Sequence, residues 1–134
     1  MAWPRIDGLR VMELGFPGPL RQELNALTLA GTKRATAGLL TADYLEEDEE
    51  LEHPGEVLVL VDDLGGSIGR IRVVNVEVVP FGEVSDDFAR AEGEGFTGHD
   101  DWAVAHRRFW SGAGQQVDEQ TSVVCVRYVL ARSS

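Results

Sequence analysis

The sequence contains little cysteine, little lysine and no long apolar run. A single cysteine, Cys125, among 134 residues excludes an internal disulfide and a zinc cluster built on cysteines. No apolar stretch approaches the length that crosses a bilayer, and residues 1–7 lack the basic and apolar regions of a signal peptide. We therefore expect a cytoplasmic protein with no membrane partner.

Positive charge is also scarce, because 12 lysine and arginine residues face 23 acidic ones and the net charge is −11. Wide binding to a nucleic acid depends on neutralising many phosphates, so a small anion or a neutral nucleoside is easier to reconcile with this charge. The acidic run 46–52 is typical of an exposed face or mobile loop. The three histidines lie in different segments without metal-ligand spacing, so neither a metal nor a cofactor is predicted. The oligomeric state is not indicated.

The only lysine is Lys33, and the other eleven basic residues are arginine. An amine accepts a proton after desolvation, which a guanidinium does not, and Thr36 carries a hydroxyl three residues later. A turn-like backbone brings the two side chains together, whereas a straight strand sends them to opposite faces. The pair is a candidate catalytic site; the alternative is an isolated lysine on a loop.

A second candidate segment is residues 91–98, where Glu92 and Glu94 alternate with glycines. In an extended stretch residues i and i+2 point the same way, so both carboxylates are expected to face one cavity and perturb each other's pKa. The alternative is a solvated turn in an acidic protein.

Periodicity predicts helices over residues 20–30, after Ser85, and from Thr97 to about Trp110, the last with Asp100 completing a capping box. Runs of β-branched residues predict a hairpin of strands 57–62 and 68–79, and a last strand over 122–130. No phosphate-binding glycine motif precedes a helix, which favours a small, curved, mixed sheet over a doubly wound one. His106 shares a helix face with aromatic residues, which favours a packed, hydrogen-bonded histidine. Cys125, between valines, is expected to be buried.

Together these segments resemble the ASCH family. The resemblance covers nearly the whole chain and rests on Gly15-Phe16, Leu-Ala-Gly-Thr-Lys-Arg-Ala-Thr-Ala at 29–37, Val-Asp-Asp at 61–63, Val-Val-Pro-Phe-Gly-Glu-Val at 78–84, Phe-Ala-Arg-Ala-Glu-Gly-Glu-Gly at 88–95, Trp102, His106, Phe109, and Val-Val-Cys at 123–125. It implies an α+β fold, a PUA-like small mixed β-barrel with flanking short helices. The expected organisation is a single domain over residues 1–134, with 1–14 as an N-terminal extension.

The resemblance also implies a cleft between the lysine-threonine turn and the Glu-Gly-Glu-Gly segment. In the branch that hydrolyses N4-acetylcytidine, the catalytic positions correspond to Lys33, Thr36 and Glu94. A neutral lysine would activate the threonine hydroxyl for attack on the acyl carbon, and the glutamate would protonate the departing amine. We expect four further residues to contact the ligand: Glu92, Arg34, Arg72 and His106.

Two other functions stay open, because other branches of the family are associated with ribonuclease activity or act as RNA-binding modules. The partner that the resemblance implies is therefore a small nucleoside or short single-stranded RNA. The sequence departs from its relatives after Glu-Gly-Glu-Gly, where an often acidic position is Phe96, and after the cysteine, where it is Val126. Phe96 either stacks on a base or joins the core.

Overall fold

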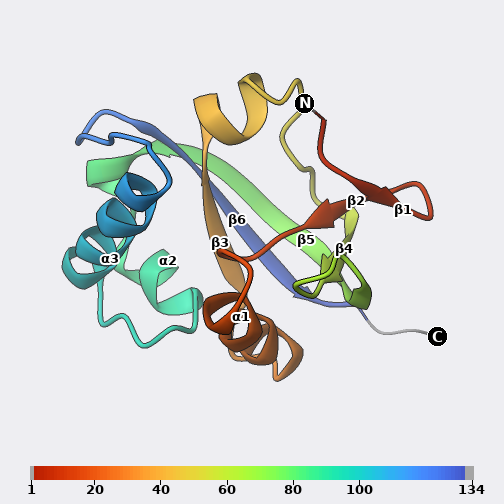
Figure 1. Ribbon diagram of the computed structural model, residues 1–134. Coiled ribbons are helices and arrows are strands. Elements are labelled where there is room, and N and C mark those ends of the chain that lie inside the picture. The colour runs from red at the N-terminus through yellow and green to blue at the C-terminus, as the bar shows by residue number, and fades with distance from the viewer. Residues whose placement is uncertain (1, 132–134) are drawn as a thin grey trace.

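The computed structural model describes residues 2–131 and places its strands in one sheet with helices on both faces (Figure 1). The elements follow in the order β1 Arg5–Ile6, β2 Leu9–Met12, α1 Pro19–Leu29, β3 Ala35–Leu39, the π-helix η1 Leu40–Leu45, β4 Val57–Val61, β5 Ser67–Pro80, the short 3-10 helix η2 Phe81–Glu83, α2 Asp86–Ala91, α3 His99–Gly112 and β6 Ser122–Leu130. The α+β class is therefore confirmed.

The sheet is six-stranded, mixed and open. Its order is β1-β2-β4-β5-β6-β3, and all pairs are antiparallel except β2 with β4. Among the described residues no pairing joins β1 to β3. The expected closed barrel is therefore not confirmed, because a barrel requires its two edge strands to bond to each other.

Alternate residues of β6 enter two different cores, so both faces of the sheet are covered. Val124 and Val126 pack in a cluster with Leu24 of α1. Val123 and Cys125 pack in a second cluster that includes side chains of α2 and α3. Period-two alternation thus places α1 on one face and the aromatic face of α3 on the other. Burial raises the pKa of the Cys125 thiol to about 12, as suits a buried structural cysteine.

The acidic run 46–52 is not simply an exposed or mobile segment. Glu49 is buried and accepts two hydrogen bonds from Arg5 and one from the main-chain N–H of Trp3, at 2.7 to 3.0 Å. Glu52 is buried beneath the Tyr44 hydroxyl, which donates to it at 2.8 Å. The expectation was wrong for these two residues, because Glu49 pairs with residues far away in the sequence and Glu52 pairs with Tyr44, eight residues before it. Residues 5–12, within the expected N-terminal extension, form β1 and β2 of the sheet.

The predicted hairpin is confirmed by β4 and β5, and the first helix by α1, which Gly31 follows with a φ of +79°. Ser85 caps α2 by accepting from the N–H of Phe88 at 3.0 Å, as expected. The cap of α3 lies one residue later than predicted, because Gly98 is the N-cap and Asp101, not Asp100, accepts its N–H. None of the helices within residues 2–131 combines the length and apolar character that crossing a membrane requires.

Candidate active site

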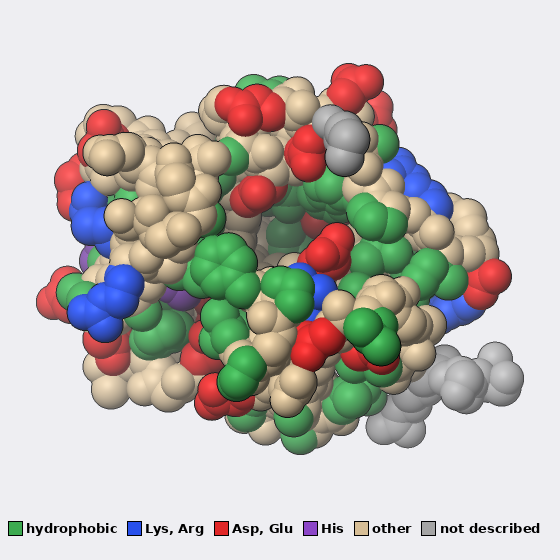
Figure 2. All heavy atoms as spheres, in the orientation of Figure 1, with side chains coloured by type: hydrophobic (Ala, Val, Ile, Leu, Met, Phe, Trp, Pro, Cys, Tyr) green, Lys and Arg blue, Asp and Glu red, His purple; other side chains and the backbone are tan. Residues whose placement is uncertain are grey.

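A cavity of about 580 Å³ opens beside the edge strand β3, on the face shown in Figure 2. Its walls come from the loop after β2, from α1, β3, η1, the segment 92–96 and α3. This volume lies within the range of roughly 300–1,000 Å³ found for small-molecule sites. Five of the residues predicted from the sequence line it together: Lys33, Thr36, Glu92, Glu94 and His106.

Lys33 is brought to the cavity by the end of α1. The left-handed Gly31 ends the helix, and the main-chain N–H of Lys33 donates to the carbonyl of Leu27 at 3.0 Å. Its side chain is 1% exposed, and Nζ lies 2.7 Å from the carbonyl oxygen of Ala35 and 2.9 Å from Oε2 of Glu94. Nζ also lies 3.3 Å from both the carbonyl oxygen and Oε1 of Glu92. The three N–H donors of a Lys33 ammonium thus have four acceptor oxygens within 3.3 Å.

Lys33 is an ammonium in this site, not the neutral amine of the expected mechanism. Burial alone lowers the pKa of Lys33, but the charges of Glu92 and Glu94 outweigh burial and raise the pKa above the ordinary value of 10.5. The lysine keeps its proton because the two neighbouring carboxylates, Glu92 and Glu94, favour its charged form.

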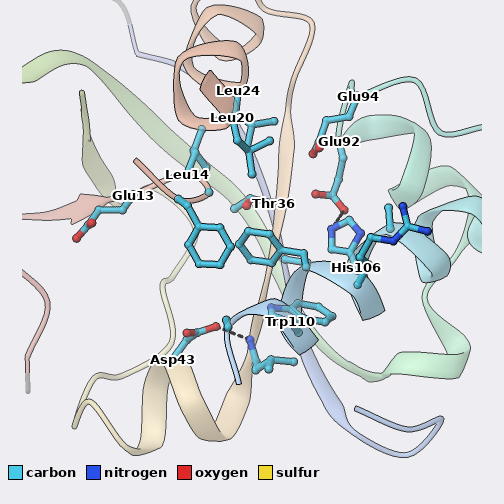
Figure 3. A pocket seen from close by; sticks show the side chains of 18 of the residues that line it. Glu13, Leu14, Leu20, Leu24, Thr36, Asp43, Glu92, Glu94, His106 and Trp110 are labelled. Carbon is cyan, nitrogen blue, oxygen red and sulfur yellow. Dashed lines mark hydrogen bonds and ion pairs between the residues drawn. The ribbon is translucent and has the colours of Figure 1, made fainter. Parts of the chain in front are cut away.

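Glu92 is the central acceptor of the buried network. Its side chain is 2% exposed, and Oε2 accepts from the indole Nε1–H of Trp102. The same oxygen lies 3.1 Å from Nε2 of His106, and Figure 3 shows these two side chains facing each other. Burial raises the pKa of Glu92, but the charge of Lys33 and the hydrogen bond of His106 hold it below its usual range. Since both oxygens already have partners inside the protein, Glu92 holds Lys33 and His106 in place.

His106 is packed and hydrogen-bonded, as predicted. Its ring stacks on Trp102 with centroids 4.3 Å apart, and Nδ1 donates to the carbonyl of Trp102 at 2.9 Å. Burial lowers the pKa of His106, but the hydrogen bond and charge of Glu92 raise it above 6.5 overall. The ring centroids of Phe96 and His106 lie 5.6 Å apart, and Phe96 packs at the margin of the second core, as one of the two alternatives expected. It also lines the cavity, and its stacking on a base stays a prediction.

Glu94 faces the cavity more openly than Glu92 does. Its side chain is 21% exposed, compared with 2% for Glu92. The two are separated by Gly93 with a φ of +69°, where a Cβ would overlap the carbonyl oxygen of Thr32. This close approach of the Glu-Gly-Glu-Gly segment to residues 32–33 allows both carboxylates to reach Lys33.

Thr36 stands on β3, paired with Val126, while residues 32–34 before it are irregular. That irregular stretch allows Lys33 and Thr36 to line the same cavity, where a continuous strand would separate them. Among residues 2–131 no hydrogen bond to the Thr36 hydroxyl is formed by a protein group, so the hydroxyl remains available to a ligand.

The two predicted arginines do not line this cavity. Arg34 lines a separate hollow together with Arg90 and Arg127. Arg72 lies on β5, and its guanidinium donates to the carbonyl of Gly55 at 3.4 Å. Arg34 follows Lys33 directly in the sequence, and the chain turns it toward the other hollow.

Phe16, Phe109 and Asp43 are among the cavity-lining residues that the sequence did not assign to the site. Phe16 and Phe109 stack with ring centroids 4.7 Å apart, and Asp43 reaches the cavity from η1. The Gly15-Phe16 pair and the helical stripe containing Phe109 were visible signals, but the sequence did not show that they meet. Asp43 had no signal beyond its proximity to the acidic run.

The chain is similar to solved structures. Protein EF3133 from Enterococcus faecalis V583, of the family model DUF984, shares 26% identity with a TM-score of 0.80 over 95% of this chain and 78% of that one. An ASCH domain from Lactobacillus crispatus JV V101 shares 28% identity with a TM-score of 0.70 over 82% of this chain and 71% of that one. Hypothetical protein PH0355, at 18% identity and a TM-score of 0.57, covers 82% of this chain and 93% of its own, and shows the fold alone.

No curated protein matches the chain significantly in sequence. The model of the ASCH domain matches residues 13–132, which include the lysine-threonine segment, both glutamates and all of α3. The chain therefore belongs to the ASCH domain family.

Proposed function

We propose that this protein is an amidohydrolase that removes the acyl group from an N4-acylated cytidine or a closely similar nucleoside. The observation that supports this best is the buried ammonium of Lys33, held by Glu92 and Glu94 in the cavity that Thr36 also lines. Such a site offers a hydroxyl nucleophile, a carboxylate for proton transfer and a fixed positive charge, which acyl transfer from an amide requires.

The ammonium of Lys33 suits the stabilisation of developing negative charge. When the substrate enters, its carbonyl oxygen takes the place of Glu94 as an acceptor from Nζ, because Glu94 is the more exposed partner. The freed Glu94 accepts the proton of the Thr36 hydroxyl as Oγ1 attacks the acyl carbon. Lys33 then stabilises the oxyanion of the tetrahedral intermediate.

Collapse of the intermediate breaks the bond between the acyl carbon and the exocyclic nitrogen. The nitrogen takes the proton from Glu94 and leaves as the free amine of cytidine, while the acyl group remains as an ester on Thr36. Water then attacks the ester, gives a proton to Glu94 and releases the acid, after which the proton returns to Thr36. Glu92 takes no proton in this sequence, because its oxygens keep Lys33, Trp102 and His106 in position.

The direct test is incubation of the purified protein with N4-acetylcytidine and chromatographic detection of cytidine and acetate. Thr36→Val keeps the shape of the side chain and removes the nucleophile, so turnover is expected to fall by about a thousandfold or more. Arg72→Gln, outside the cavity, is the control and is expected to keep wild-type turnover. Unchanged turnover in Thr36→Val would contradict the acyl-enzyme step.

A second candidate function is interaction with RNA, and the hollow that contains Arg34, Arg90 and Arg127 favours it. Asp87 is the single acidic residue in its lining, and it pairs with Arg127 at 2.9 Å. Three arginines against one aspartate give this hollow a local excess of positive charge. A phosphate is therefore more favourable here than elsewhere on the acidic surface. Incubation with total RNA, followed by electrophoresis, separates a ribonuclease from the amidohydrolase.

A further inference from the structure

The cavity has a second polar side that the proposed reaction does not use. Figure 3 places Asp43 on the opposite side of Thr36 from Glu92, Glu94 and His106. The walls of the cavity also include the stacked rings of Phe16 and Phe109 and the apolar side chains of Leu20 and Leu24. A ligand that fills the cavity therefore meets polar groups on both sides of Thr36 and also meets apolar and aromatic surface.

Asp43 is held in a defined position. It lies in the π-helix η1, directly after β3, and its Oδ2 accepts from the main-chain N–H of Leu39 at 2.8 Å. The indole Nε1–H of Trp3 donates to the main-chain carbonyl of Asp43 at 2.9 Å. Gly38 leaves room for the carboxylate, since a Cβ there would lie 3.3 Å from Oδ2. A π-helical turn of this kind is often found at functional sites.

The other carboxylate oxygen of Asp43 is available to a ligand. Within residues 2–131, no protein group donates a hydrogen bond to Oδ1. Asp43 is exposed to solvent and lines the cavity, so a ligand in the cavity can reach its side chain. An ionised carboxylate only accepts hydrogen bonds, so the matching ligand group is a donor. Adjacent sugar hydroxyls are such donors, and carboxylates bind ribose hydroxyls in dinucleotide-binding folds.

We propose that Asp43 is a specificity-determining residue that binds the ribose hydroxyls of the substrate, so that the site prefers ribonucleosides. This inference rests on the proposed function and assigns the orientation of the substrate. The acyl group lies at Lys33, Thr36 and Glu94, and the ribose lies at Asp43. The base lies between them against the apolar and aromatic wall that Phe16 and Phe109 supply.

The test compares N4-acetylcytidine with N4-acetyl-2′,3′-dideoxycytidine, which lacks both ribose hydroxyls. For the wild type, kcat/KM is expected to be about tenfold or more higher for the ribonucleoside, as follows from losing a hydrogen bond to a charged group. In Asp43→Ala the ratio of the two kcat/KM values should fall to about one. Asp43→Asn, which still accepts from Leu39, should lower the ratio while keeping the wild-type melting temperature.

Glu46→Gln is the matched control, because it removes one negative charge at the end of η1 from a residue that does not line the cavity. This variant should keep the wild-type ratio. A wild-type ratio near one, or an undiminished ratio in Asp43→Ala, would overturn the inference while leaving the amidohydrolase proposal intact.

A binding measurement separates this inference from the reaction. Calorimetric titration with cytidine and with 2′,3′-dideoxycytidine involves no chemistry, and the same preference and the same loss in Asp43→Ala are expected. If neither acetylated compound is hydrolysed but this preference is found, the proposed reaction fails and the role of Asp43 stands. Equal binding of the two nucleosides by the wild type would count against Asp43.

Discussion

At the scale of single residues, the protonation state of Lys33 separates two mechanisms. A lysine base must lose its proton first, so a rate that depends on it rises about tenfold per pH unit below its pKa. The carboxylates around Lys33 raise its pKa above 10.5, so the ammonium persists at all working pH values. We therefore expect the kcat/KM of the wild type to show no such rise between about pH 7 and about pH 9. A continuous tenfold rise per unit would restore the lysine as the base.

Lys33→Met tests the same residue by removing the charge and keeping much of the apolar stem. Loss of one group that stabilises an oxyanion commonly costs about a hundredfold to a thousandfold in kcat. We expect a decrease of this size with a smaller change in KM, measured by steady-state kinetics on N4-acetylcytidine. An increase of this size in KM with an unchanged kcat would instead assign Lys33 to substrate binding.

Glu92 and Glu94 touch the same ammonium but differ in burial, which makes them a matched pair. In Glu92→Gln, Lys33 and His106 lose their buried counter-charge, so the free energy of unfolding should fall by about 3 kcal/mol. Glu94→Gln removes the same charge from a more exposed position and should cost clearly less. Urea denaturation measures both. Equal losses would show that Glu92 has no special structural role.

His106 gives the fold a dependence on pH. Its pKa in the folded protein is raised above 6.5, so its contribution to stability is full below 6.5 and is lost as the pH rises through the raised value. As the pH rises above 6.5, the free energy of unfolding of the wild type should therefore decline more steeply than that of His106→Asn. Parallel curves for the two proteins would exclude this contribution.

At the scale of elements, the approach of the Glu-Gly-Glu-Gly segment to residues 32–33 depends on one glycine. Gly93 and Gly95 both have positive φ, but only at Gly93 would a Cβ overlap a neighbouring backbone. Gly95→Ala should cost about 1 kcal/mol for its backbone conformation. Gly93→Ala should cost about 3 kcal/mol, because the overlap of the new Cβ with the Thr32 carbonyl adds to the cost of the backbone conformation. This variant should also lower turnover. Urea denaturation of the two variants compares these costs.

Elements with strong local patterns were predictable, and elements fixed by distant partners were not. Alternating β-branched residues around Gly65 and Gly66 specified the hairpin, and helical spacing from Leu20 specified α1. In contrast, β3 contains two alanines and a glycine and is a strand because β6 pairs with it. The same limit applies to the site. The spacing of Lys33, Thr36 and Glu94 was informative, whereas Asp43 enters through β3 and η1, which local propensity does not predict.

At the scale of the whole molecule, the net charge of −11 opposes long polyanions even where arginines gather. Affinity for long RNA should therefore be weak at low salt and should fall steeply toward physiological salt, while the affinity for cytidine changes little. Titration of both ligands at two ionic strengths measures the difference. Tight RNA binding that persists at physiological salt would place the RNA-interacting function first.

The strand order also decides when the site can form as the chain is made. Thr36 stands on an edge strand whose sole neighbour among residues 2–131 is β6, and β6 leaves the ribosome after all the other described elements. The lysine and threonine are synthesised early, but the strand that fixes the threonine arrives about ninety residues later. A nascent chain that lacks β6 should therefore carry all the proposed catalytic residues and still be inactive.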